Sequence, residues 1–216
     1  MKIFIDSADI AEIQEAASMG VLDGVTTNPT LVAKTGRKYL TVLEDIAKIV
    51  DGPISAETVS LDCKGMMEEA KVFARIHPNI TIKIAMGTEG LKAVKLCVEQ
   101  GIKTNVTACM STKQAVLAAK AGATYVSLFW ARIEDMGYDA QQIAEDSVKV
   151  FDRGKFKSKI ILGSFRQISH INRAILTGAH VLTIPTKILL DMAWNPRTES
   201  TIQEFLDSWA EFNKNK

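Results

Sequence analysis

Lys83 is the residue of this sequence that is best placed to act as a nucleophile. It lies near the end of the run ITIKIA (80–85), in which isoleucines alternate with Thr81 and Lys83. Because successive side chains of a β-strand point to opposite faces, Lys83 would share a face with Thr81, away from the isoleucines. In a poorly solvated pocket an ammonium loses hydration, which favours the neutral amine, and such an amine attacks carbonyl carbons. The alternative is a lysine that extends past the strand end into solvent.

Polar side chains also lie at or near the ends of other β-rich runs. Each could be a hydrogen-bonded core residue or a helix cap. Buried polar groups cost free energy unless they are paired, however, so their joint placement indicates a site. Phe129 has the same strand parity as one of them, Ser127, and would line the same face. The polar set is Asp6, Glu57, Asn105, Thr107, Ser127 and Ser164.

The segment TTNPT (26–30) has two interpretations. Asn28 suits the N-cap of a helix that has Pro29 at its first position. The amide of Asn28 could equally hold a substrate hydroxyl, with Thr27 beside it in the same candidate site.

Arg132 and Arg166 are candidates for an anion site, since each comes shortly after a β-rich run. A planar guanidinium matches an oxyanion, and the loop after the seventh strand of a barrel commonly binds phosphate. The alternatives are a surface ion pair of Arg132 with Glu134 or Asp135, and an exposed position at a helix start for Arg166.

These residues need a scaffold that brings several strand ends together. Short β-branched runs alternate along the chain with longer amphipathic segments, the former typical of strands and the latter of helices. Ser7 and Ser111 precede two of the helices as candidate caps, and Gly101, Gly122 and Gly178 lie where helices should end. Strands are predicted over 2–6, 24–27, 54–59, 80–85, 103–108, 125–129, 159–164 and 181–185. Helices are predicted over 8–18, 37–50, 62–76, 88–100, 111–121, 139–151, 199–213 and near 186–193.

Eight such units predict a parallel sheet closed into a single (β/α)8 barrel over residues 1–216, with an extra C-terminal helix. An open, doubly wound sheet is the alternative, although no GxGxxG follows the first strand. The last helix would carry its apolar residues in one stripe, against its own barrel or a neighbouring subunit. That stripe is Ile202, Phe205, Leu206, Trp209 and Phe212.

Composition excludes several classes of protein. The 216 residues are 47% hydrophobic and 24% charged, which is ordinary for a globular enzyme, and no apolar run is long enough to cross a bilayer. A net charge of +1 argues against a nucleic-acid partner. Asp6 interrupts any apolar signal-peptide core, so we expect a cytoplasmic protein with reduced cysteines. The three histidines share no metal-ligand spacing, so no metal is expected.

Taken together, the motifs resemble the small transaldolase family, which includes the fructose-6-phosphate aldolases. The resemblance spans essentially the whole chain. It implies a class I aldolase barrel with a Schiff-base lysine, no metal or organic cofactor, and a homo-oligomer, pentameric or decameric. The segments that carry it are MKIFIDSADI (1–10), DGVTTNPTL (23–31), ITIKIAM (80–86), KTNVTACMSTKQAVLAAKAGATYVS (103–127), RIEDMG (132–137) and GSFR (163–166).

The resemblance also implies roles for individual residues. Lys83 would form the Schiff base and Asp6 would be the acid/base carboxylate. Glu57 and Thr107 would hold the catalytic water. The substrate site would comprise Thr27 and Phe129, the sugar-hydroxyl contacts Asn28, Asn105 and Ser127, and the anion-binding Arg132, Ser164 and Arg166.

The implied reaction transfers a dihydroxyacetone unit from a ketose phosphate, of the fructose 6-phosphate type, to an aldose. Glu57 and Phe129 are similar to the transaldolase branch, because the aldolase branch typically has Gln and Tyr there. The segments LFWAR (128–132) and IAMG (84–87) depart from the common PFVGR and IPMT. A sulfonated donor such as 6-deoxy-6-sulfofructose therefore stays open. So do aldol cleavage without transfer and a non-catalytic barrel that binds sugar phosphates.

Overall fold

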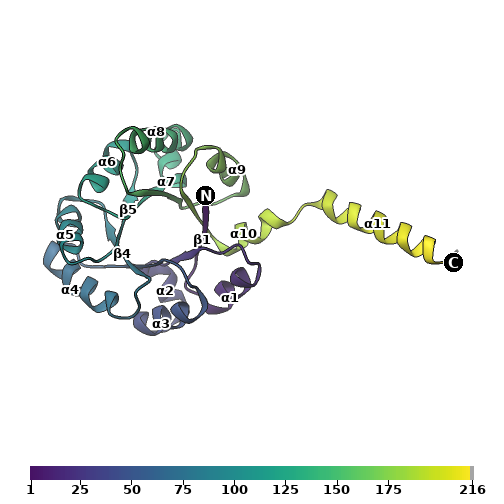
Figure 1. The fold of residues 1–216 in the computed structure, drawn as a ribbon, viewed down its shortest axis with the longest axis horizontal. Coiled ribbons are helices and arrows are strands. Elements are labelled where there is room, and N and C mark those ends of the chain that lie inside the picture. Colours follow the sequence, from purple (N-terminus) through teal and green to yellow (C-terminus); the bar gives the residue numbers. More distant parts are fainter. Residues whose placement is uncertain (215–216) are drawn as a thin grey trace.

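Eight parallel strands close into a barrel in the computed structural model, which describes residues 1–214 (Figure 1). The strands pair in chain order, and the last pairs with the first. The predicted (β/α)8 barrel is thereby confirmed, and the open sheet is excluded. The strands are β1 Lys2–Asp6, β2 Gly24–Thr26, β3 Ile54–Glu57, β4 Ile80–Ala85, β5 Thr104–Cys109, β6 Tyr125–Phe129, β7 Lys159–Gly163 and β8 Val181–Ile184.

Helices surround the barrel on its outer side (Figure 1). Each helix range predicted from the sequence contains a helix, whereas α7 and α9 were given no range, and α7 fills what was predicted as a loop around Arg132. The helices are α1 Ile10–Ser18, α2 Pro29–Thr35, α3 Tyr39–Ile49, α4 Cys63–Ala74, α5 Thr88–Glu99, α6 Thr112–Lys120, α7 Trp130–Asp135, α8 Ala140–Arg153, α9 Ile168–Leu176, α10 Thr186–Ala193 and α11 Pro196–Lys214.

Short polar side chains begin two of these helices. Ser111 caps α6, as predicted, by accepting a hydrogen bond from the N–H of Gln114. The prediction of Ser7 as the cap of α1 was wrong. Asp9 accepts from two N–H groups of the first turn, whereas the Ser7 hydroxyl donates to the Glu12 carboxylate. The glycines predicted to end helices have left-handed φ angles of 71° at Gly101, 95° at Gly122 and 77° at Gly178.

The barrel interior is apolar at one end and polar at the other, because strand residues two apart share a face. Phe4, Ile161 and Val181 form a small buried cluster against which Tyr125 packs. Two positions further along the same strands, on the same face, come the residues that line a cavity: Asp6, Gly163, Thr183 and Ser127. The apolar cluster therefore closes the bottom of the barrel and supports the polar layer above it.

The C-terminal helix α11 projects away from the barrel (Figure 1). None of its described residues is buried, and the predicted apolar stripe is exposed, with Phe205 68% and Trp209 62% accessible. Within residues 1–214, no helix combines the length and the apolar character that a bilayer span requires.

Candidate active site

A cavity of about 410 Å³ opens at the C-terminal ends of the strands, where barrel enzymes place their chemistry. It collects most of the residues that the sequence indicated, from strands that are far apart in the chain. Its lining is Asp6, Thr26, Asn28, Pro29, Thr30, Leu31, Glu57, Lys83, Ser127, Phe129, Arg132, Gly163, Ser164 and Thr183.

Lys83 lines this cavity and is only 5% exposed, so it does not extend into solvent. Its Nζ lies 2.9 Å from Glu57 Oε2 and donates a hydrogen bond of 3.0 Å to the backbone carbonyl of Thr27. Glu57 and Lys83 are direct partners in the β3–β4 register. A carboxylate and a carbonyl thus fix the amine at one point of the cavity wall, and Glu57 is within reach to exchange a proton with it.

Asp6 is the second carboxylate of the cavity. Its Oδ1 accepts a hydrogen bond of 2.7 Å from Thr26 Oγ1, which lies 2.6 Å from Thr183 Oγ1. Because the Thr26 proton is directed to Asp6, Thr183 must donate to Thr26. Burial raises the pKa of Asp6 above its ordinary 3.8, although the charge of Lys83 and the bond from Thr26 act in the opposite direction. A carboxyl group with a raised pKa is suited to take up and return a proton near neutral pH.

Asn105 lies just beneath the cavity rather than on its wall. Its Oδ1 accepts a hydrogen bond of 2.8 Å from Ser127 Oγ, and its Nδ2 donates one of 3.1 Å to Ser55 Oγ. Asn105 is fully buried, whereas Ser127 contributes to the cavity lining. In this structure Asn105 therefore orients Ser127.

Thr107 is also buried, one rung further along β5. Its Oγ1 has no hydrogen-bond partner among the described residues. Buried hydroxyl groups are usually paired, so this one needs an explanation. The backbone carbonyl of Thr107 accepts a hydrogen bond of 2.9 Å from Met86 N, which ties Thr107 to the end of β4.

The TTNPT segment combines both interpretations given for it. Asn28 Oδ1 accepts a hydrogen bond of 2.9 Å from Leu31 N as the N-cap of α2, and Asn28 also lines the cavity. Thr27, in contrast, is buried outside the lining, and its Oγ1 donates a 2.7 Å hydrogen bond to the carbonyl of Ser55. Thr27 therefore contacts Lys83 and is not on the cavity wall.

The rim of the cavity carries one of the two candidate anion-binding arginines. Arg132 of α7 and Ser164 both line it, and Ser164 has a φ of 61°, a conformation uncommon for a residue with a side chain. The suggested ion pair of Arg132 with Glu134 or Asp135 is not formed, because those carboxylates bind other partners.

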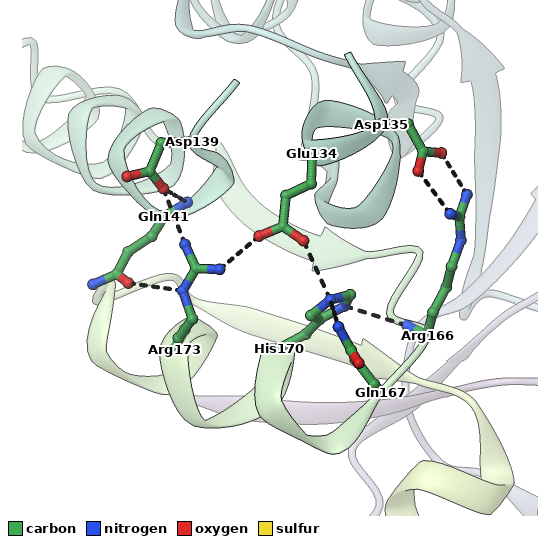
Figure 2. A network of polar contacts seen from close by, with 8 residues as sticks. All are labelled: Glu134, Asp135, Asp139, Gln141, Arg166, Gln167, His170 and Arg173. Carbon is green, nitrogen blue, oxygen red and sulfur yellow. Dashed lines mark hydrogen bonds and ion pairs between the residues drawn. The ribbon is translucent and has the colours of Figure 1, made fainter. Parts of the chain in front are cut away.

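Arg166 does not line the cavity. Its guanidinium forms two hydrogen bonds with the carboxylate of Asp135, at 2.8 and 2.6 Å (Figure 2). Both side chains are about half exposed, and the pair lowers the pKa of Asp135. The placement matches the exposed helix-start alternative, because α9 begins two residues later.

A neighbouring network joins α7 to α9 (Figure 2). Glu134 Oε1 accepts a hydrogen bond of 2.6 Å from Arg173, and Glu134 Oε2 lies 3.2 Å from Nε2 of His170. Burial lowers the pKa of His170, although Glu134 opposes that shift. The network fixes the short helix that carries Arg132.

Three residues of this region were missed from the sequence. Thr26 and Thr183 hold Asp6, and strand parity could have found both, because each shares a face with the polar layer. Tyr39 contacts Thr27 and Glu57 from the first turn of α3, and no short-range pattern indicates it.

Comparison with known proteins gives one consistent result. The family model described as transaldolase/fructose-6-phosphate aldolase matches residues 3–216. A probable transaldolase of Geotalea uraniireducens is 50% identical over 214 residues, which cover 99% of this chain and all of that protein. One from Desulforamulus reducens is 50% identical over 97% of both chains, and one from Desulforudis audaxviator is 44% identical over 99% of this chain and all of that protein. The chain belongs to the transaldolase/fructose-6-phosphate aldolase family of enzymes.

Proposed function

We propose that this enzyme is a transaldolase that moves a dihydroxyacetone unit from a ketose phosphate, of the fructose 6-phosphate type, to an aldose acceptor. The observation that carries the proposal is the buried amine of Lys83 on the cavity wall, with Glu57 2.9 Å away and Asp6 on the same wall. A lysine in such a place is suited to form an imine with a ketone.

The first half of the reaction cleaves the donor. Neutral Lys83 attacks the C2 ketone, and loss of water gives an iminium that withdraws electrons from C3. Asp6 removes the proton of the C4 hydroxyl, the C3–C4 bond breaks, and an aldehyde leaves. A dihydroxyacetone enamine then stays covalently bound to Lys83.

The second half reverses these steps with a new aldehyde. The enamine attacks the acceptor carbonyl, Asp6 returns its proton to the new alkoxide, and water releases the product from Lys83. The water that adds to the iminium would be held by Glu57 and Thr107. The buried Thr107 hydroxyl without a partner in the described structure supports this role.

We further propose that the far anion of the sugar binds at the rim formed by Arg132 and Ser164, with Asn28, Ser127 and Phe129 along the sugar chain. Arg166 would join them after releasing Asp135, since an exposed ion pair is easily exchanged. A sulfonate carries one charge less than a phosphate dianion and fits the same donors, so 6-deoxy-6-sulfofructose is the second candidate donor.

Product analysis with each donor, with and without glyceraldehyde 3-phosphate, tests the proposal. Transferase activity predicts ketose consumption that depends on the acceptor. Appreciable release of free dihydroxyacetone without an acceptor would instead identify an aldolase. Borohydride should trap a reduced adduct on Lys83, and tight ligand binding without any adduct would identify a non-catalytic binding barrel.

A cytoplasmic homo-oligomer, pentameric or decameric, is proposed as the working form. An exposed apolar stripe on a projecting helix is typical of a surface that another chain covers. Sedimentation of the full chain and of a Phe205→Asp/Trp209→Asp variant tests this, because both substitutions place a charge in the stripe. Identical monomeric behaviour of both proteins would contradict it.

A further inference from the structure

Tyr39 connects the two groups that hold Lys83. Its hydroxyl accepts a hydrogen bond of 2.6 Å from the backbone N–H of Glu57, and its Oη lies 3.0 Å from Thr27 Oγ1. The Thr27 hydroxyl donates its proton to Ser55, so the Tyr39 hydroxyl must donate to Thr27. One side chain from α3 therefore contacts both Glu57, whose carboxylate pairs with Lys83, and Thr27, whose carbonyl accepts from Lys83.

The contact matters because of the hydrogen-bond pattern between β2 and β3. The N–H groups of Val25 and Thr27 donate to the carbonyls of Pro53 and Ser55. In a parallel ladder the next bond would run from the N–H of Glu57 to the carbonyl of Thr27. Instead the N–H of Glu57 donates to Tyr39, and the carbonyl of Thr27 accepts from Lys83.

We infer that Tyr39 is a positioning residue for the amine of Lys83: its hydroxyl takes the last ladder bond of β3 and so leaves the Thr27 carbonyl free for Lys83. The inference rests on the proposed imine chemistry. The phenol is suited to this task because it has one acceptor site for an N–H and one proton for Thr27.

Two further observations support a fixed role. The Tyr39 ring packs against Phe73 with centroids 5.2 Å apart, so the hydroxyl is held from outside the cavity. Burial raises the pKa of Tyr39 to about 12, so the phenol keeps its donor proton throughout the working pH range. The loop after Glu57 is held as well, since Glu69 accepts from the N–H groups of Val59 and Ser60.

Tyr39→Phe removes only the oxygen and keeps the ring against Phe73. The N–H of Glu57 would then turn to the carbonyl of Thr27 and compete with Lys83 for it. Because a small misplacement of a reacting group lowers rates by up to about 100-fold, we expect kcat and the rate of borohydride trapping to fall by about 10- to 100-fold. The KM for fructose 6-phosphate should change by less than about twofold, since Tyr39 does not line the cavity.

A double-mutant cycle separates positioning from general stability. In a Glu57→Gln background, Tyr39→Phe should cost much less, because the carboxylate that it helps to place is already gone. Tyr125→Phe is the matched control. It removes a hydroxyl at the opposite end of the barrel interior, where Tyr125 contacts Phe4, and should leave kcat unchanged.

The outcomes are distinct. Failure to trap any adduct in the wild-type enzyme would overturn the proposed function itself. Normal trapping in the wild type together with unchanged kcat in Tyr39→Phe would overturn only the role of Tyr39. So would an undiminished effect in the Glu57→Gln background, or a Tyr39→Phe protein that does not fold. A crystal structure of Tyr39→Phe should show the N–H of Glu57 bonded to the carbonyl of Thr27.

Discussion

Glu57 and Lys83 are direct cross-strand partners, and their side chains meet as an ion pair of 2.9 Å inside the barrel mouth. Parallel strands in register place two such residues side by side. The amine that forms the imine therefore has a proton acceptor built into the adjacent strand, and the geometry is fixed by the backbone rather than by a loop.

Glu57→Gln should keep the shape of this pair and remove its charge. We expect kcat to fall by about 100-fold or more, because a matched proton carrier contributes about 10²–10⁴-fold. Single-turnover trapping with borohydride should slow as well, while the adduct should still form on Lys83. An unchanged trapping rate would contradict a role for Glu57 in imine formation or hydrolysis.

Asp6→Asn should stop carbon–carbon cleavage without preventing imine formation. A fall of about 10²–10⁴-fold in kcat is expected from the loss of the base, whereas borohydride should still trap the donor on Lys83. Steady-state rates and mass analysis of the trapped protein measure the two effects. Loss of trapping in parallel with loss of turnover would mean that Asp6 acts before the cleavage step.

The pH dependence of stability should report the raised pKa of Asp6. Folded Asp6 keeps its proton at pH values where the unfolded chain, with a pKa near 3.8, has lost it. Folding is therefore favoured by this group at low pH, and that contribution is lost as the pH rises through the folded pKa. Urea unfolding should show a smaller decline over this window in Asp6→Asn than in the wild type, and identical slopes would contradict the assignment.

Strand parity explains why much of the site was visible in the sequence. Lys83, Asp6, Glu57 and Ser127 sit on strands whose inward face follows from alternation alone, and all four line the cavity. Arg166 was beyond this reasoning, since the direction of its guanidinium depends on Asp135 from a helix that the sequence pattern did not indicate.

The same limit applies to residues that act from outside the barrel. The contact of Tyr39 with Glu57 depends on how α3 packs against the strand ends, and it joins residues 18 apart in the chain. Asn105 was placed in the right layer, but only the structure shows that it is bonded to Ser127 beneath the cavity.

Arg132→Met should weaken binding of the anionic end of the donor. We expect a rise of about tenfold or more in KM for fructose 6-phosphate, because a hydrogen bond between charged groups contributes about 1.5–3 kcal/mol. Turnover of uncharged dihydroxyacetone as donor should change little, which makes it the internal control. Equal losses with both donors would place Arg132 outside the anion site.

Asp135→Ala tests whether Arg166 is exchanged between its ion pair and the substrate. Freed from Asp135, Arg166 should bind the donor anion more readily, so that KM for fructose 6-phosphate falls severalfold while kinetics with dihydroxyacetone stay the same. The effect should disappear in an Asp135→Ala/Arg166→Ala variant. An unchanged KM in the single variant would mean that Arg166 stays outside the site throughout the reaction.

Substitution of the amine itself is the most direct test. Lys83→Met keeps the length and the apolar stem of the side chain and removes only the nucleophile. Incubation with fructose 6-phosphate and borohydride, followed by peptide mass analysis, should show an adduct on Lys83 in the wild type, with none in the variant and no turnover. Turnover in Lys83→Met, or an adduct on another lysine, would contradict the account.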